Sequence, residues 1–137
     1  MQFKELGYMD KAYNTGIMFT LATTEDKEFV YMGETVAFDD GKPKFKKGKG
    51  ISISREQFKD FAHNVNENLE FTMNLSTSLK LKSEHSTFKE STFQNIRLWS
   101  CSGDKEVPLA KGFTVPSEII DDFVYLVQEV LEKLEEE

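Results

Sequence analysis

Alternating apolar and polar residues mark the extended segments of this chain. Residues 71–81 alternate without interruption, which predicts one long strand with a single buried face. A polar turn is expected at 83–87, followed by a second strand over 88–101, a run rich in aromatic and β-branched residues. Two short strands at 107–109 and 113–115 complete a predicted four-stranded antiparallel sheet.

The same pattern occurs 62 residues upstream. Residues 41–69 align with 103–131 without a gap, so that Lys49-Gly50-Ile51-Ser52 corresponds to Lys111-Gly112-Phe113-Thr114. This shared order indicates two copies of one supersecondary unit, because each copy must bury the same face. The first copy is therefore expected to have a strand over 9–19, a turn at 23–27, and further strands at 28–38, 44–46 and 51–53.

A helix is expected to close each copy. Ser54 followed three residues later by Gln57 is a capping-box pattern, and apolar residues recur at helical spacing from 58 to 69. In the second copy Pro116 suits a helix start, and the apolar band over 119–134 is wider than one sheet face requires. The excess predicts that this helix packs against the other copy.

These elements predict an α+β protein. Two repeats of a four-stranded antiparallel sheet followed by a helix are expected to pack as an intramolecular pseudo-dimer, the first repeat over 1–69 and the second over 70–137. The chain has 137 residues, which fits one compact domain. Because a lone unit of about sixty residues is only marginally stable, the two repeats are expected to share one core.

Composition excludes several functional classes. With 39% hydrophobic and 12% aromatic residues the chain is globular rather than disordered. No segment has the apolar length of a membrane span or the layout of a signal peptide. A cytoplasmic location without membrane contact is therefore expected, nucleoid-associated in a cell or in the host cytoplasm if the source is viral.

Candidate catalytic and metal-binding groups are sparse. Cys101 is the single cysteine, so no internal disulfide is expected, and with His63 and His85 it does not make a zinc set. Gly48-Lys49-Gly50 lacks the spacing of a Walker phosphate-binding loop. We therefore expect a protein that is not an enzyme and that uses neither a metal nor a cofactor.

The net charge of −7 is unevenly distributed. Residues 117–137 contain eight acids and one lysine, a local charge of −7, so residues 1–116 sum to zero. Within this neutral part, five lysines and Arg55 fall close together between residues 42 and 55, a basic patch of the kind that contacts phosphates. The alternative interpretation is a lysine-rich hairpin that only increases solubility.

Residues 42–58 resemble the positive cofactor four family of transcriptional coactivators and its bacterial and phage relatives. The hallmark of that family is a lysine-rich loop that runs into Lys-Gly-Ile-Ser and then a helix that opens Glu-Gln-aromatic. Lys49-Gly50-Ile51-Ser52 and Glu56-Gln57-Phe58 carry the resemblance here. In the second copy, Ile96-Arg97-Leu98-Trp99 resembles the Ile-Arg-x-x-Trp strand of the family, whereas the loop at 104–111 departs from its pattern because it is poor in lysine.

The resemblance implies a dimer fused into one polypeptide. Members of the family form homodimers in which two curved sheets make channels for single-stranded DNA, with the helices at the interface. The Whirly and purine-rich-element-binding proteins share this general architecture and also bind single strands. The implied function is non-catalytic binding of single-stranded DNA in replication, recombination or transcription.

Single-strand binding requires cationic groups for the backbone and flat aromatic groups for unstacked bases. Phe93, Arg97 and Trp99 share one strand face, whereas Ile96 and Leu98 point to the face where the helix is expected. An arginine beside a tryptophan on an exposed face is hard to explain as core. The expected nucleic-acid-binding residues are Tyr31, Lys42, Lys44, Lys46, Lys47, Lys49, Lys80, Lys82, Phe88, Lys89, Phe93, Arg97, Trp99 and Lys111.

The two copies are expected to contribute different groups. The first has five lysines between residues 42 and 49, but Thr35 and Ala37 stand where the second has Arg97 and Trp99. The sheet face of the first copy is therefore expected to carry fewer aromatic and cationic groups than that of the second. These differences predict a single composite track across both copies, with weak sequence preference and with affinity that falls as salt rises.

The expected partner is single-stranded DNA, with RNA and further self-association left open. The acidic C-terminus, Glu135-Glu136-Glu137, would compete with nucleic acid for the basic surface, recruit replication or transcription proteins, or form a solvated helix end. The alternative function is a protein-interaction module or transcription cofactor that uses the acidic helix and has little affinity for nucleic acid.

Overall fold

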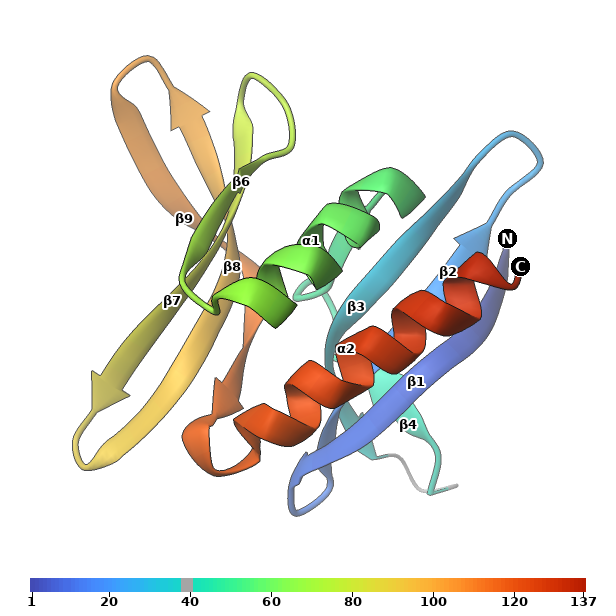
Figure 1. The fold of residues 1–137 in the computed structure, drawn as a ribbon, viewed down its shortest axis with the longest axis horizontal. Helices are drawn as coiled ribbons and strands as arrows, with labels where there is room; N and C mark the ends of the chain where they lie inside the picture. The colour runs from blue at the N-terminus through green and yellow to red at the C-terminus, as the bar shows by residue number, and fades with distance from the viewer. Residues whose placement is uncertain (38–40) are drawn as a thin grey trace.

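The computed structural model describes residues 1–37 and 41–137. Two antiparallel sheets and two helices make up this part of the chain, so the predicted α+β class is confirmed. Figure 1 shows the two helices running side by side, with one sheet to either side of the pair. The chain termini lie close together, and Lys4 forms an ion pair with Glu137.

The first sheet has five strands within the described residues, in the order β1-β2-β3-β4, with β5 also paired to β3. They are β1 (Gln2–Ala12), β2 (Thr15–Thr23), β3 (Glu28–Ala37), β4 (Pro43–Phe45) and β5 (Ile51–Ile53). The single strand predicted over 9–19 is wrong, because β1 and β2 form a hairpin that turns at Tyr13 and Asn14. Asn14 has a φ of 60°, a left-handed conformation that asparagine tolerates better than most residues.

The first sheet thus has five strands within the described residues where four were predicted, but its later elements agree with the prediction. The backbone N–H of Thr24 donates to the carbonyl of Lys27 at 2.7 Å, which closes the predicted turn between β2 and β3. The strands expected at 44–46 and 51–53 are present within one residue. Position 38, the predicted end of the preceding strand, lies outside the described residues.

The second sheet has the order β6-β7-β8-β9. Its strands are β6 (Phe71–Asn74), β7 (Leu79–Phe88), β8 (Ser91–Ser102) and β9 (Lys105–Pro116). The single strand predicted over 71–81 is wrong, because the N–H groups of Leu75 and Ser76 both donate to the carbonyl of Leu79, at 2.9 and 3.1 Å, and close a turn. Four residues separate β6 from β7, so the odd–even alternation continues unbroken through the turn.

Two further predictions for the second sheet are corrected. Residues 83–87, expected to turn, belong to β7, and the chain reverses instead at Lys89 and Glu90, where Lys89 has a φ of 58°. The two short strands expected at 107–109 and 113–115 are parts of β9, whose pairing with β8 is irregular between Arg97 and Trp99.

Helix α1 (Arg55–Glu67) begins with the predicted capping box. The Oγ of Ser54 accepts a hydrogen bond from the N–H of Gln57 at 3.0 Å, and the Oε1 of Gln57 accepts one from the N–H of Ser54 at 2.9 Å. The second helix starts later than predicted. A 3₁₀ turn, η1 (Ser117–Ile119), follows Pro116 and leads into α2 (Ile120–Glu135).

The two helices contact each other, as the wide apolar band of the second one predicted. The Nε2 of Gln128 on α2 donates to the carbonyl of Ala62 on α1 at 3.0 Å. Phe19 of β2 lies against both helices, with its ring centre 5.9 Å from that of Phe58 and 6.2 Å from that of Phe123. One continuous apolar core therefore connects both sheets and both helices, and the opposite faces of the sheets are left for other contacts.

Candidate functional site

Strand β8 presents two different faces. Ile96 and Leu98 are buried in the core, whereas Arg97 and Trp99 are half-buried on the opposite face. The side-chain parity predicted for this strand is therefore confirmed. Both helices of the described residues lie on the other side of this sheet (Figure 1), which leaves the face of Arg97 and Trp99 available to a ligand.

The lysines of β7 on this face are partly neutralised by a glutamate from β9. Lys80 lies opposite Trp99, and Lys82 lies opposite Arg97. The carboxylate of Glu106 accepts hydrogen bonds from Lys80 at 2.5 Å and from Lys82 at 2.7 Å. The hydrogen bond from Lys80, and after it the one from Lys82, lowers the pKa of Glu106 to about 2. The two lysines therefore add less positive charge to this face than predicted.

Trp99 and Arg97 also have partners within the protein. The ammonium of Lys82 lies 4.3 Å from the centre of the Trp99 ring, a cation–π contact. The Nη1 of Arg97 donates to the carbonyl of Leu109 at 2.8 Å. The indole N–H of Trp99 is buried and has no acceptor among the described residues. A ligand on this part of the sheet would have to share or replace these contacts.

The same face continues along β8 to the turn with β7. Phe93 is half-buried on the face of Trp99, six residues and so about 20 Å away. Phe88, at the end of β7, is 67% exposed, and the ammonium of Lys89 lies 5.6 Å from its ring centre. The structure thus places Phe88, Lys89 and Phe93 at one end of the face and Trp99 toward the other.

The first sheet carries an aromatic pocket on the face away from the helices, and sequence reasoning missed it. The first-sheet pocket has a volume of about 570 Å³ and is lined by four aromatic side chains with five other residues. These are Phe3, Phe29, Tyr31 and Phe45, with Met1, Lys46, Lys47, Gly48 and Ser52. The rings of Tyr31 and Phe45 meet edge to face, with their centres 4.7 Å apart.

A second hollow lies beside the first-sheet pocket and shares two of its rings. This adjacent hollow measures about 420 Å³ and is lined by Phe3, Met18, Thr20, Pro43, Lys44 and Phe45. The face of the first sheet therefore carries more aromatic side chains than the sequence predicted. The shared parity of Phe29 and Tyr31 was a usable signal in the sequence, whereas the strand that carries Phe3 was not predicted.

The lysine-rich loop borders the first-sheet pocket. Lys42, Lys44, Lys47 and Lys49 are exposed, and Lys46 is half-buried. Gly48 has a φ of 75°, a left-handed conformation that lets the loop turn between β4 and β5. Of the loop lysines predicted as ligand-binding groups, Lys44, Lys46 and Lys47 therefore lie beside the aromatic rings of their own sheet.

Lys46 is held by the half-buried carboxylate of Glu34. Lys46 and Lys11 both donate to the carboxylate of Glu34 on β3, and Lys11 also donates to the Oγ1 of Thr114 on β9 at 2.7 Å. Burial acts to raise the pKa of Glu34, but the hydrogen bonds and charges of Lys11 and Lys46 outweigh it and lower this pKa below its ordinary value. This cluster links the two sheets and anchors one end of the loop.

The two sheets meet beside the lysine-rich loop. The N–H of Gly112 on β9 donates to the carbonyl of Lys49 at 2.9 Å. Lys46, Lys49 and Arg97 line a small hollow of about 170 Å³ at this junction. The structure therefore brings the loop of the first copy next to Arg97 of the second, and the neighbouring Lys111 is exposed on β9.

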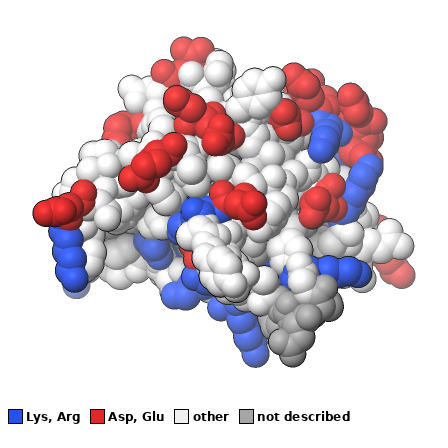
Figure 2. Space-filling view, turned by 90° about the horizontal axis from the view of Figure 1, so that it is seen from below, with Lys and Arg blue, Asp and Glu red and all other residues white. Residues whose placement is uncertain are grey.

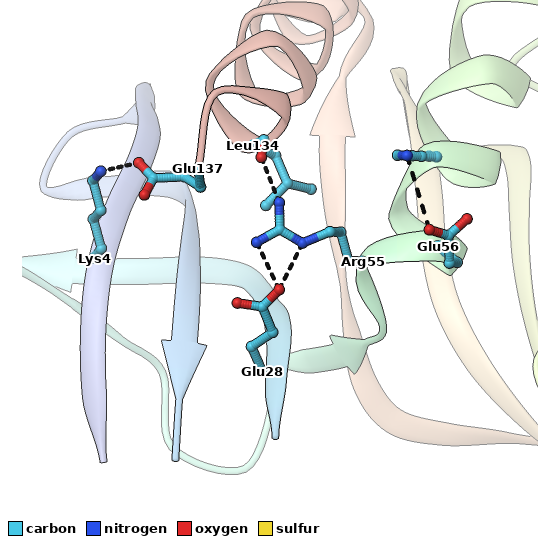
Figure 3. A network of polar contacts seen from close by, with 7 residues as sticks. Lys4, Glu28, Arg55, Glu56, Leu134 and Glu137 are labelled. Carbon is cyan, nitrogen blue, oxygen red and sulfur yellow. Dashed lines mark hydrogen bonds and ion pairs between the residues drawn. The ribbon is translucent and has the colours of Figure 1, made fainter. Parts of the chain in front are cut away.

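Arg55, grouped with the loop lysines in the sequence, has a different position (Figure 3). Its guanidinium donates to Glu28 of β3, with contacts of 2.6 and 2.7 Å, and to the carbonyl of Leu134 near the end of α2. Glu137 lies close by in an ion pair with Lys4. Arg55 therefore fastens the C-terminal part of α2 and does not belong to the basic patch.

Charge is separated over the molecular surface. Figure 2 shows acidic side chains gathered over one half of the view and most lysines and arginines over the other. On α2 and its approach, Glu118, Asp121, Asp122, Glu129 and Glu132 are all exposed. The overall negative charge is therefore compatible with a basic surface elsewhere.

Comparisons with known proteins give distant likenesses in structure and no match in sequence. No family model matches the chain, and no curated protein matches it in sequence. The structure titled as that of the plant transcriptional regulator PBF-2 aligns with 98% of this chain and covers 83% of that one, at 8% identity and a TM-score of 0.41. Thus no family match accompanies the resemblance to the positive cofactor four family.

No helix of residues 1–37 and 41–137 combines the length and the hydrophobicity needed to cross a membrane. Within the same residues, no group of three or more histidine, cysteine, aspartate or glutamate side chains is arranged to hold a metal ion.

Proposed function

We propose that this protein binds single-stranded DNA and catalyses no reaction. The main support is the pairing of aromatic and cationic side chains on the sheet faces that point away from the helices. Unstacked bases stack on aromatic rings, and lysine and arginine donate hydrogen bonds to the phosphates between the bases. The contact between Lys49 and Gly112 joins the two faces at the lysine-rich loop, which supports one composite track across both sheets.

The proposal includes the fused-dimer architecture and the kinship with the positive cofactor four family. The contact between α1 and α2 and the shared core support it. The hydrogen bond from the N–H of Gly112 to the carbonyl of Lys49 also supports it, because Lys49-Gly50 and Lys111-Gly112 correspond in the repeat. The division into repeats at 1–69 and 70–137 stays a prediction of this proposal.

The cellular setting follows from the same proposal. Binding without strong sequence preference would serve replication, recombination or transcription in the cytoplasm, with RNA as a second ligand to be tested. The ion pair of Glu137 with Lys4 favours a docked helix end over a tail that covers the basic surface. Recruitment of other proteins by the acidic helix would then use the exposed acids of α2.

A titration with fluorescent oligo-dT and with a duplex of equal length, at two salt concentrations, tests the proposed function. Trp99 is the single tryptophan, so its emission reports on the second sheet. The single strand should bind more tightly than the duplex, its affinity should fall as salt rises, and Trp99 emission should change on binding. Equal affinity for the duplex would overturn the preference for single strands, whereas no binding at low salt would overturn the whole proposal and favour a protein-interaction module.

A further inference from the structure

Two hollows lie next to each other on the first sheet, separated by shared aromatic rings. Phe3 and Phe45 line both the first-sheet pocket, of about 570 Å³, and the adjacent hollow, of about 420 Å³. Both hollows open on the face away from the helices, and Phe3 is 59% exposed there. The arrangement offers flat apolar surfaces at two neighbouring positions.

From this geometry we infer that the first sheet binds two successive nucleobases of a single strand, one in each hollow, and is the main base-binding site of the protein. The inference rests on the proposed function and assigns its base contacts to Phe3, Tyr31 and Phe45. Planar bases of any sequence stack on aromatic rings, so such a site would be tolerant of sequence.

The charges around the hollows select an anionic ligand. Among the described residues that line them, Lys44, Lys46 and Lys47 are cationic and none is acidic. Lys44 and Lys47 are exposed at the rim of the two hollows, where the phosphates of a bound strand would lie. A neutral or proline-rich peptide would bind these hollows less favourably, because it carries no negative charge to interact with the lysines.

Tyr31 is held in place for such a contact. Its ring and hydroxyl lie against the backbone of Gly50, where a Cβ would approach the Tyr31 ring atoms to 2.1 Å. Ser52 of β5 lies opposite Tyr31 in the sheet and is exposed beside the pocket. The hydroxyl of Ser52 thus adds a hydrogen-bonding group next to the stacking surface.

The second sheet is less well prepared to receive bases. The Trp99 ring already has the ammonium of Lys82 at 4.3 Å from its centre, and Glu106 already binds Lys80 and Lys82. A base and its phosphates would compete with these internal contacts. In the first sheet Glu34 likewise holds Lys46, but no acidic side chain is among the described residues that line the two hollows.

Photo-cross-linking of the full-length protein to oligo-dT that carries one iodouracil tests the inference. Mass spectrometry of the cross-linked peptides should identify Phe3, Tyr31 or Phe45. If the oligonucleotide binds but cross-links appear only at Phe93 or Trp99, the inference is overturned while the proposed function stands. If binding itself is absent in the titration, both fail.

A variant with a matched control gives a second, independent measurement. Phe3→Ala should reduce affinity for oligo-dT about tenfold, the scale of one lost stacking contact. It should leave affinity for an abasic oligonucleotide of equal length unchanged, because it removes no charge. Tyr125→Ala truncates a 70% exposed ring on α2 and should change neither affinity. An equal loss for the abasic strand, or no loss for oligo-dT, would refute the base-binding role of Phe3.

Discussion

The ammonium nitrogen of Lys82 lies 4.3 Å from the centre of the Trp99 ring and donates a hydrogen bond to Glu106 at 2.7 Å. These contacts connect three neighbouring strands, with Lys82 on β7, Trp99 on β8 and Glu106 on β9. The groups of the second sheet best suited to nucleic acid are thus already partly satisfied within the protein. The net binding free energy of a ligand here is only the difference between the contacts it makes and the internal contacts it replaces.

Glu106→Gln should therefore increase the affinity for single-stranded DNA. The substitution removes the carboxylate that competes with phosphate for Lys80 and Lys82. If one more phosphate contact forms, the dependence of log affinity on log salt should steepen by about 0.7. Fluorescence anisotropy of labelled oligo-dT over a series of salt concentrations measures both effects.

Glu118→Gln is the charge-matched control for this variant, because it removes one negative charge from an exposed position in η1. An equal gain in affinity from both variants would show that net charge, and not the Glu106 contact, limits binding. Since the pKa of Glu106 is about 2, its carboxylate stays ionised in mildly acidic solution. The difference between Glu106→Gln and wild type should thus be the same at neutral and mildly acidic pH.

Local signals in the sequence predicted α1 well and the first hairpin poorly. The capping box of Ser54 and Gln57 depends on residues three apart, so a linear pattern contains all of it. The break in the predicted strand over 71–81 is invisible to alternation, because a four-residue turn keeps Leu75 and Leu79 in the same parity. Strand β1 was largely missed, since a bulge between Glu5 and Gly7 shifts its pattern from one face to the other.

The sequence predicted which face of a strand each candidate side chain occupies. It did not predict which side chains come together where strands from distant parts of the chain are neighbours. The parity of Arg97 and Trp99 follows from the two-residue period of a strand. The pairing of Glu106 with Lys80 and Lys82 depends on the irregular register of β9 against β8, which no local pattern specifies. The first-sheet pocket likewise needs Phe3 and Phe45, from opposite ends of one sheet path, to lie side by side.

Gly112→Ala should destabilise the junction between the two sheets. A Cβ at Gly112 would lie 2.6 Å from the carbonyl oxygen of Ile96 and 2.9 Å from the Cα of Arg97, both of them backbone atoms that cannot rotate away. We expect a loss of about 1–3 kcal/mol in the free energy of unfolding, measured by urea denaturation. The exposed neighbour Lys111 provides the control, since Lys111→Ala should change stability by less than about 0.5 kcal/mol.

Arg55→Ala should loosen the end of α2 without weakening DNA binding. The side chain connects Glu28 to the carbonyl of Leu134, so its removal leaves the last turn of the helix without this anchor. Faster amide hydrogen exchange after residue 130, with unchanged affinity for oligo-dT, is the expected result. A clear loss of affinity would instead show that Arg55 contributes to DNA binding together with the loop lysines. Lys4→Ala, which removes an exposed ion pair, should have a smaller effect on exchange.

Glu34→Gln should destabilise the protein at neutral pH, and the difference from wild type should shrink in acid. Lys11 and Lys46 hold the pKa of Glu34 below its ordinary value of 4.5 in spite of burial. A carboxyl group whose pKa is lowered on folding contributes stability above its unfolded pKa, and this contribution disappears as the pH falls through the folded pKa. Wild type should therefore lose its advantage over the variant as the pH drops below about 4.5.

Urea denaturation of wild type and Glu34→Gln at a series of pH values measures this difference. Glu84→Gln is a suitable control, because Glu84 is exposed on β7 and its substitution should change stability little at any pH. A difference between wild type and Glu34→Gln that stays constant from neutral pH into acid would mean that the ionised carboxylate of Glu34 does not stabilise the fold. The link between β3, β9 and the lysine-rich loop would then depend on packing, because the ion pairs with Lys11 and Lys46 would contribute nothing to stability.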